Sequence, residues 1–260
     1  MKYCIYRLLA FSFITVSAIT SAQTPSFLSN IPISIDENVK LPLDSKISIT
    51  LITAKPKKLS QTLSDNFDIE PLTVNEQSVQ LPLTKTYVHD RKQSSKHLQD
   101  SFIVDYTEPS ASAFTKEFKD KYKETYQLSD LERYVSEYIT ETTYIHGFNI
   151  ASVVADTRSG DCTEHAVLLA ALARSLSIPA KIVFGTAIVE ESDNLNAYGH
   201  AWVEVYQNDH WQLLDAALYG AIGSKIYYLP ANELTNEGPG YAFGIAEIVG
   251  LLPQALHIMK

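Results

Sequence analysis

The chain has 260 residues, of which 45% are hydrophobic, and carries a formal net charge of −9 at pH 7 with an isoelectric point near 5.2. These values are typical of a globular protein of one or two domains that is long enough to bury a hydrophobic core. The acidic balance leaves no basic stripe to neutralise phosphates, which argues against a nucleic-acid partner.

Residues 1–22 have the pattern of a secretory signal peptide. The basic residues Lys2 and Arg7 precede an apolar run from Leu8 to Val16, and small residues end the segment. The run is too short to span a bilayer, and no second run of membrane length follows it. We therefore expect cleavage before Gln23, a periplasmic or secreted protein, and no integral membrane segment after cleavage.

The cysteine count indicates one free thiol in the mature chain. Cys4 falls within the expected signal peptide, so Cys162 is the remaining cysteine after cleavage. A disulfide framework is then excluded, although an exported protein would be permitted one. A single unpaired cysteine in an exported protein is a candidate reactive thiol.

Residues 23–112 predict a β-rich accessory module. Apolar and polar residues alternate in a way that predicts four strands, over residues 46–54, 67–74, 79–88 and 101–106. Pro82 favours an edge position or a bulge for its strand. Residues 90–100 are polar and predict an exposed loop, and we expect His89 and His97 to be solvated rather than ligands.

Residues 113–260 predict a second unit, which begins with two helices. An aromatic stripe at helical spacing predicts the first helix over residues 113–126. The second follows Leu128, with Ser129 as its N-cap and Glu132 three residues later.

The most informative stretch is GDCTEHAVLLAALARSLSIPAK, residues 160–181. Asp161 is a good N-cap and Glu164 completes a capping box, so Cys162 is predicted to be the first helical residue. The residues that follow are apolar on nearly all sides, which indicates a buried helix. Free N–H groups and the helix dipole at such an N-terminus favour the thiolate, the nucleophilic form of cysteine. The alternative is a buried structural cysteine.

A strand over residues 180–189 and an acidic loop over residues 190–198 are predicted next. The loop lacks the ligand spacing of a calcium site, so we expect it to be solvated. Residues 199–218 then predict a β-hairpin. Its turn is either Gln207–Asn208 or Asn208–Asp209.

Either two-residue turn places His200 and Asp215 on the same face of the hairpin. They are directly opposite in the first register and diagonal in the second, with Cβ atoms roughly 5–8 Å apart. An imidazole beside a carboxylate is what a thiol nucleophile requires. The imidazole takes the proton, and the carboxylate fixes the tautomer and stabilises the imidazolium.

Together these segments resemble the transglutaminase-like superfamily, whose core is a compact variant of the papain-like fold. The matching pieces are GDCTEHA, IPAKIVFG, GHAWVEVY and HWQLLDA, within residues 130–217. The resemblance implies an α+β fold in which the buried cysteine helix packs on an antiparallel sheet. It also implies that Cys162 is the nucleophile, His200 the general base and Asp215 the orienting carboxylate. Ala216 departs from the commoner pattern, in which a proline often follows the aspartate.

The upstream tryptophan that supplies an oxyanion donor in animal transglutaminases is also missing from this sequence. The N–H of Cys162 is one expected donor, and Tyr144 and Asn149 are candidates for the other. The resemblance implies an enzyme that forms a thioester with an amide or peptide substrate. Hydrolysis or acyl transfer to an amine would follow, with no cofactor, and the expected partner is a protein or peptide substrate.

Two other functions are compatible with the same residues. The first is a non-catalytic protein- or peptide-binding module built on a papain-like core. The second is a metal site, because Cys162 and His165 lie three residues apart on one helix, and His200 and Asp215 would complete a tetrahedral set.

The C-terminal residues predict a strand over 225–229 and a helix over 242–252. We expect them to complete the sheet of the Cys162 unit and to pack a closing segment on it. His257 is expected to be structural or exposed.

Overall fold

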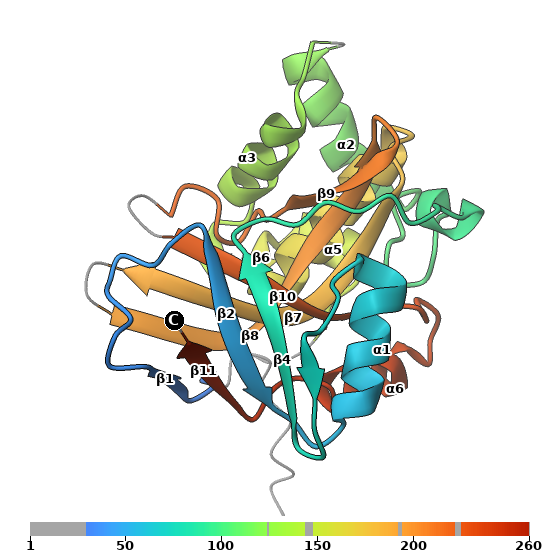
Figure 1. The fold of residues 1–260 in the computed structure, drawn as a ribbon. Coiled ribbons are helices and arrows are strands. Elements are labelled where there is room, and N and C mark those ends of the chain that lie inside the picture. The colour runs from blue at the N-terminus through green and yellow to red at the C-terminus, as the bar shows by residue number, and fades with distance from the viewer. Residues whose placement is uncertain (1–29, 124, 144–147, 192–193, 222–224, 260) are drawn as a thin grey trace, which may run out of the picture.

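The computed structural model describes residues 30–123, 125–143, 148–191, 194–221 and 225–259, so the expected signal peptide lies outside the described residues. The fold is α+β, as predicted, with two main sheets and helices on their faces (Figure 1). No helix within the described ranges is long and apolar enough to cross a membrane.

The elements are as follows, in chain order. The strands are β1 (Ile33–Ile35), β2 (Lys46–Ile52), β3 (Thr73–Val74), β4 (Ser78–Thr84), β5 (Glu141–Thr142), β6 (Ser159–Gly160), β7 (Ala180–Glu191), β8 (Asn194–Gln207), β9 (His210–Leu214), β10 (Lys225–Glu233) and β11 (Ala255–Met259). The helices are α1 (Pro56–Phe67), α2 (Pro109–Tyr122), α3 (Leu128–Tyr138), α4 (Ala151–Thr157), α5 (Cys162–Ser175) and α6 (Tyr241–Val249), with a 3-10 turn at Ser95–Leu98.

The first main sheet is antiparallel throughout, in the order β10-β7-β8-β9. Strands β7 and β8 form a long hairpin, paired from Ala180 with Val205 to Glu191 with Asn194. The prediction of a loop over residues 190–198 was therefore wrong. Leu195 and Ala197 alternate with polar residues in this segment, but its acidic composition hides the strand pattern.

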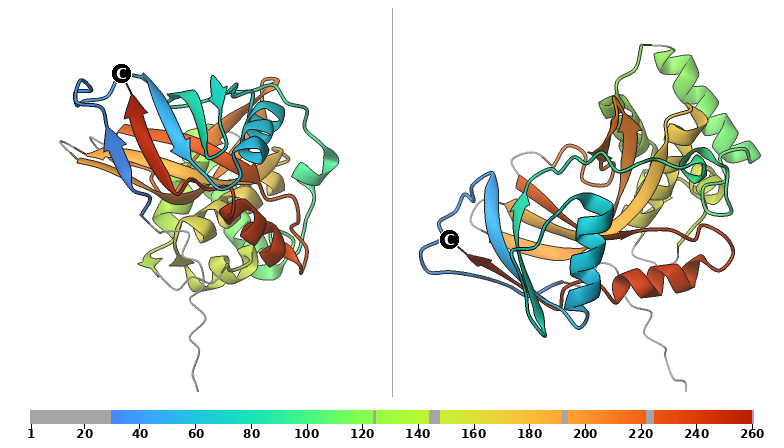
Figure 2. Two further views of the ribbon diagram at one scale, coloured as in Figure 1. Left: turned by 60° about the horizontal axis from the view of Figure 1, so that its bottom comes forward. Right: turned by 45° about the vertical axis from the view of Figure 1, so that its right-hand side comes forward.

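Helix α5 packs on one face of this sheet, which confirms the predicted buried cysteine helix on an antiparallel sheet (Figure 2). Every residue from Ala166 to Arg174 is buried. Ala201, Val203 and Val205 of β8 belong to the same core as the helix. Trp202 points to the opposite face, into a smaller cluster that includes Phe67 and Tyr228.

The second main sheet joins the two ends of the described chain, in the order β1-β11-β2-β4-β3 (Figure 1). The last strand, β11, lies between β1 and β2, parallel to the first and antiparallel to the second. The C-terminal residues thus contribute β10 to the sheet of the Cys162 unit, as expected, but β11 to the sheet of the N-terminal residues. A division after residue 112 stays our proposal for the domain boundary.

Two predicted strands in the N-terminal part are absent from the described residues. Instead of a strand over residues 67–74, helix α1 ends at Phe67 and only the short β3 follows. Leu59, Leu63 and Phe67 are buried at helical spacing, a pattern that our strand prediction overlooked. Residues 101–106 form bends and a turn. Ile103 is buried there, and its backbone N–H and carbonyl are hydrogen-bonded to Glu237 and Ala151 rather than to a strand.

Other predicted elements are confirmed with adjusted boundaries. Strand β3 pairs only with Val79 and Gln80, so β4 has a neighbour on one side alone at Pro82, as expected for an edge position. Helix α3 begins with a capping box of Gln127 and Asp130, so the predicted N-cap at Ser129 was wrong. His257 is partly exposed and its Nε2 lies 2.9 Å from Asp36 Oδ1.

Candidate active site

Cys162 is the first residue of α5, as the capping pattern predicts. Asp161 Oδ1 accepts a 2.9 Å hydrogen bond from the Thr163 N–H, and Glu164 Oε2 accepts a 3.0 Å hydrogen bond from the Asp161 N–H. A Cβ atom at Gly160 would lie 2.2 Å from the Cβ of Glu164, so this turn requires glycine. The sequence GDCTE therefore encodes both the tight turn and the position of the thiol at the start of the helix.

The backbone N–H of Cys162 is available to a ligand. Within the described ranges, no acceptor is hydrogen-bonded to this group, as is usual for the first N–H groups of a helix. The Cys162 side chain is buried beneath it, with 5% of the residue exposed. An N–H group of this kind can hold a negatively charged oxygen with the help of the helix dipole.

The hairpin brings His200 and Asp215 together. Gln207 pairs with His210, so the turn is Asn208–Asp209, and both turn residues have positive φ. In this register Asp215 comes directly after β9 and lies diagonal to His200, which is the second of the two predicted arrangements. His200 Nε2 is 2.7 Å from Asp215 Oδ2, and both side chains are buried.

His200 also interacts with Cys162, and its second ring nitrogen is not used by Asp215. His200 Nδ1 is buried and makes no hydrogen bond of ordinary geometry within the described residues. Burial opposes protonation of this imidazole, but the charge and hydrogen bond of Asp215, together with the interaction with Cys162, raise the pKa of His200 to about 10. His200 is thus positively charged at neutral pH, with a carboxylate on one side and a thiol on the other.

Asp215 remains ionised although it is buried. Burial alone would raise its pKa, but the charge of His200 and hydrogen bonds from His200, Tyr228 and the Leu218 N–H lower it below the usual value. The Tyr228 hydroxyl donates to Oδ2 over 2.8 Å, and the Ala217 and Leu218 N–H groups donate to Oδ1 over 3.0 and 3.1 Å.

Sequence reasoning missed two residues that contact Asp215. Tyr228 lies in a predicted strand, but nothing in the local pattern of β10 indicates that it reaches the hairpin. We expected Glu132 to cap α3, whereas its Oε1 accepts a 2.7 Å hydrogen bond from the Asp215 N–H. Burial raises the pKa of Glu132 to about 7, although this hydrogen bond opposes the shift.

Glu164 and His165 are held by the turn before α5. Glu164 Oε1 accepts a 3.0 Å hydrogen bond from the Asn149 N–H, and burial raises the pKa of Glu164 to about 7. His165 Nδ1 lies 2.7 Å from the Asp161 carbonyl oxygen, and burial lowers the pKa of His165. Among the described residues, no three His, Cys, Asp or Glu side chains are arranged to hold a metal ion, so the geometry gives the metal-site alternative no support.

The structure describes only one of the two residues predicted as the second oxyanion donor. Tyr144 lies outside the described residues, and the Asn149 N–H is already bonded to Glu164. Tyr198 is a further candidate, because it contacts His200 and interacts electrostatically with Cys162. Its ring meets that of His200 edge to face, with centroids 6.1 Å apart. Burial and then the charges of Asp215 and Cys162 raise the pKa of Tyr198 to about 12, so it keeps its hydroxyl hydrogen.

A second buried polar cluster corrects the prediction for two histidines. His89 and His97 are buried, not solvated. His89 Nε2 lies 2.9 Å from Glu204 Oε2, and the Tyr87 hydroxyl donates to Glu204 Oε1. Burial would raise the pKa of Glu204, but the hydrogen bond from His89 and the charge of Lys181 lower it below its usual value.

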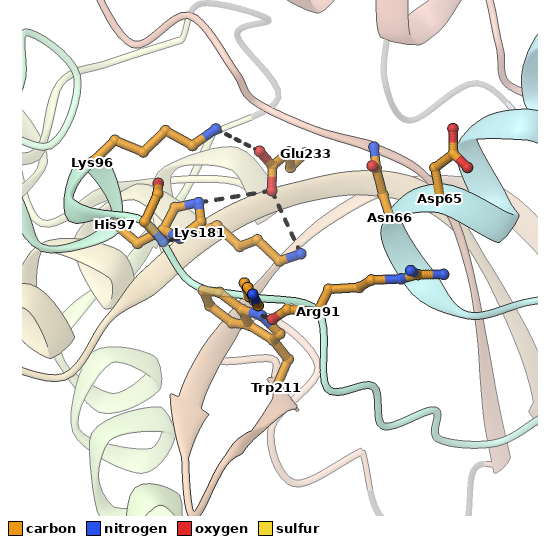
Figure 3. A pocket seen from close by; sticks show the side chains of 10 residues that line it. Asp65, Asn66, Arg91, Lys96, His97, Lys181, Trp211 and Glu233 are labelled. Atoms are coloured by element: carbon orange, nitrogen blue, oxygen red, sulfur yellow. Dashed lines mark hydrogen bonds and ion pairs between the residues drawn. The ribbon is translucent and has the colours of Figure 1, made fainter.

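Lys181 links this cluster to a pocket of about 330 Å³ (Figure 3). Its Nζ lies 3.0 Å from Glu204 Oε2 and 3.5 Å from Glu233 Oε2, and it also packs over the ring of Trp211. Figure 3 shows Lys96, His97 and Lys181 converging on Glu233. The carboxylates of Glu204 and Glu233 thus pair with the nearby basic side chains. These contacts hold the segment containing residues 87–97 against the sheet.

Comparisons with known proteins give one family match and several similar solved structures. A family model described as the transglutaminase-like superfamily matches residues 112–216. Among solved structures, a protein from Cytophaga hutchinsonii that is provisionally described as a cysteine protease is similar, with a TM-score of 0.43 and 17% identity, over 79% of this chain and 78% of that chain. The periplasmic domain of TgpA from Pseudomonas aeruginosa, bound to ethylmercury, has a TM-score of 0.40 and 19% identity, over 75% of this chain and 78% of that one.

No curated protein matches the sequence. The span matched by the family model runs from α2 to the residues that follow β9, and it contains Cys162, His200 and Asp215. Residues 112–216 of this chain therefore match the transglutaminase-like superfamily, over the segment that carries the three candidate residues.

Proposed function

We propose that the protein is an exported thiol enzyme that acts on amide or peptide bonds, with Cys162 as nucleophile, His200 as acid and base, and Asp215 as the orienting carboxylate. The observation that carries the proposal is the 2.7 Å contact between His200 Nε2 and Asp215 Oδ2, which leaves Nδ1 for the thiol at the start of α5. A buried imidazole that interacts with the thiol supplies the base that a cysteine nucleophile requires. Export is proposed from the signal-like sequence of residues 1–22.

The first half-reaction forms a thioester. The Cys162 thiolate attacks the carbonyl carbon of the amide, a C–S bond forms, and negative charge moves to the carbonyl oxygen. We assign this oxygen to the Cys162 N–H and the Tyr198 hydroxyl, because both donors lie near the thiol and neither has another partner within the described residues. His200 Nδ1 then gives its proton to the amide nitrogen, the C–N bond breaks, and an amine leaves.

The second half-reaction regenerates the thiolate. His200 Nδ1 takes a proton from water or from an incoming amine, whose oxygen or nitrogen attacks the thioester carbon. The C–S bond breaks, and Cys162 leaves as thiolate while the product is a carboxylic acid or a new amide. Asp215 holds the imidazole in position and stabilises its charge throughout.

Alkylation of the mature protein with iodoacetamide tests the activated nucleophile without a known substrate. We expect the wild-type thiol to react at pH 7 about tenfold or more faster than that of His200→Ala, because the substitution removes the cationic partner. Cys162→Ser controls for labelling elsewhere, since no other cysteine lies in residues 23–260. Equal rates for wild type and His200→Ala would overturn the proposal in favour of a non-catalytic binding module.

A casein substrate separates the two reaction outcomes. Ammonia release without an added amine indicates hydrolysis of glutamine side chains, and new peptide N-termini indicate proteolysis. Incorporation of monodansylcadaverine into casein indicates acyl transfer. All three signals should disappear in Cys162→Ser.

A further inference from the structure

One oxygen of the Asp215 carboxylate serves two side chains. Oδ2 accepts from His200 Nε2 on β8 over 2.7 Å and from the Tyr228 hydroxyl on β10 over 2.8 Å. Oδ1 is held separately by the backbone N–H groups of residues 217 and 218. The oxygen that contacts the proposed base is thus also held by a residue of β10. In the sheet order, β7 separates β10 from the hairpin β8–β9.

Tyr228 is packed so that its hydroxyl has little freedom. The residue is 6% exposed. Its ring lies 6.3 Å from the ring of His200 and packs edge to face on Trp202 at 5.3 Å, in the small cluster on the side of the sheet away from α5. Tyr228 is paired in the ladder with Ala187 of β7, which fixes the position of its backbone.

We propose that Tyr228 is a positioning residue of the triad, which holds Asp215 Oδ2 in the plane of the His200 ring and keeps His200 Nδ1 directed at Cys162. This inference rests on the proposed function. A hydroxyl whose donor atom and ring are both fixed restricts rotation of the carboxylate, and the carboxylate in turn restricts the imidazole. Tyr228 does not touch the reacting atoms, so it acts only through Asp215 and His200.

The hydroxyl also keeps Asp215 ionised. Burial raises the pKa of Tyr228 well above its usual range, so the phenol remains a donor. Its hydrogen bond is one of the interactions that lower the pKa of Asp215. The other titratable groups that act on Asp215 are Glu132 on α3, His165 on α5, and Tyr198 and His200 on β8. None of these donates to Oδ2 except His200.

The test compares Tyr228→Phe with Tyr227→Phe. Tyr227 is the adjacent residue of β10, is fully buried and donates its hydroxyl to the Asp44 carbonyl oxygen over 2.6 Å, with no hydrogen bond to Asp215. Iodoacetamide alkylation of Cys162 is measured for each variant from pH 4 to 10. We expect Tyr228→Phe to react about threefold to tenfold more slowly at pH 7. The acid limb of its pH–rate profile, where the alkylation rate falls with falling pH, should move to higher pH by up to about one unit, because Asp215 loses a hydrogen-bond donor.

Incorporation of 3-fluorotyrosine at position 228 gives the opposite change. Fluorine makes the phenol a stronger donor, so the acid limb should move to lower pH while the rate at pH 7 is retained. If the Tyr228 hydroxyl had a structural role alone, fluorination would leave the acid limb of the pH–rate profile unchanged. If circular dichroism shows that Tyr228→Phe does not fold, the fluorotyrosine protein alone decides.

The outcomes separate this inference from the proposed function. If wild type reacts no faster than His200→Ala, the proposed function fails. If wild type is activated but Tyr228→Phe has the rate and acid limb of Tyr227→Phe, only the positioning role is overturned. An unmoved acid limb in the fluorotyrosine protein overturns it as well.

Discussion

The backbone N–H of Asp215 donates a 2.7 Å hydrogen bond to Glu132 Oε1, which joins α3 to the end of β9 at the carboxylate that contacts His200. Glu132 is therefore a half-buried carboxyl group beside a buried carboxylate. Burial raises its pKa to about 7, so the folded protein holds a proton there that the unfolded chain releases at lower pH.

Glu132→Gln is expected to flatten the pH dependence of stability. An acid whose pKa is raised on folding costs no stability below about pH 4.5, and the cost grows until the folded group ionises near pH 7. Gln keeps an acceptor for the Asp215 N–H but has no charge. At pH 8 the variant should be more stable than wild type by about 1–3 kcal/mol, after allowance for partial exposure.

Urea unfolding at pH 5 and pH 8 measures this effect. Glu137→Gln is the matched control, since Glu137 lies on the same helix, is exposed and pairs with Lys121. Wild type should lose stability relative to Glu132→Gln between the two pH values. Parallel pH dependence in the two proteins would show that the carboxyl group is not protonated on folding.

Tyr198→Phe should separate alkylation from acyl chemistry. Removing an oxyanion donor costs about 100-fold to 1000-fold in turnover, because charge develops on the carbonyl oxygen. Alkylation by iodoacetamide displaces iodide and develops no charge on a carbonyl oxygen, so its rate should stay at the wild-type value. Monodansylcadaverine incorporation or ammonia release from casein, measured beside iodoacetamide kinetics, checks the pair of outcomes. Loss of both activities together would mean that Tyr198 supports the nucleophile instead.

Gly160→Ala is expected to destabilise the turn that precedes Cys162. The added Cβ would lie 2.2 Å from the Cβ of Glu164, so the backbone or the capping box must shift. The expected loss is about 1–3 kcal/mol in the free energy of unfolding, with slower alkylation of Cys162. Gly238→Ala is the control, because its Cβ would approach only the Asn236 side chain, at 3.3 Å. Thermal unfolding of both variants gives the comparison, and equal midpoints would contradict the close approach.

Lys181→Met should destabilise the fold by leaving Glu204 buried with its main cationic partner removed. Lys181 is 4% exposed and its Nζ lies 3.0 Å from Glu204 Oε2. Breaking a buried pair from one side costs about 3–5 kcal/mol. The folded protein lowers the pKa of Glu204, so this stabilisation is present above the unfolded pKa and is lost as the pH falls.

Urea unfolding at pH 7 is the measurement for Lys181→Met, with the exposed Lys57→Met as control. Glu204→Gln should recover part of the loss in the double variant, because the uncompensated charge is gone. A double variant no more stable than Lys181→Met would argue against a charge penalty.

The amino-acid sequence alone determined the parts of this protein that depend on neighbours along the chain. Asp161 and Glu164 cap the helix of Cys162 within four residues, and the two-residue turn Asn208–Asp209 sets the register that brings His200 to Asp215. The capping box and the shared face of His200 and Asp215 follow from local hydrogen bonds and period-two alternation, so both could be predicted. The sequence left two possible turns, and the structure selects Asn208–Asp209. The proposed triad is consequently local apart from the meeting of the hairpin with α5.

Only the tertiary structure decided which distant groups surround that geometry. Tyr228 and Glu132 reach Asp215 from β10 and α3, and their sequence positions carry no sign of the contact. His89 and His97 lie in a polar stretch that predicts exposure, yet they are buried where that stretch crosses the sheet. Likewise β11 pairs with β1 and β2 from the other end of the chain. Burial and long-range pairing depend on what packs against a segment, which its own pattern of residues does not contain.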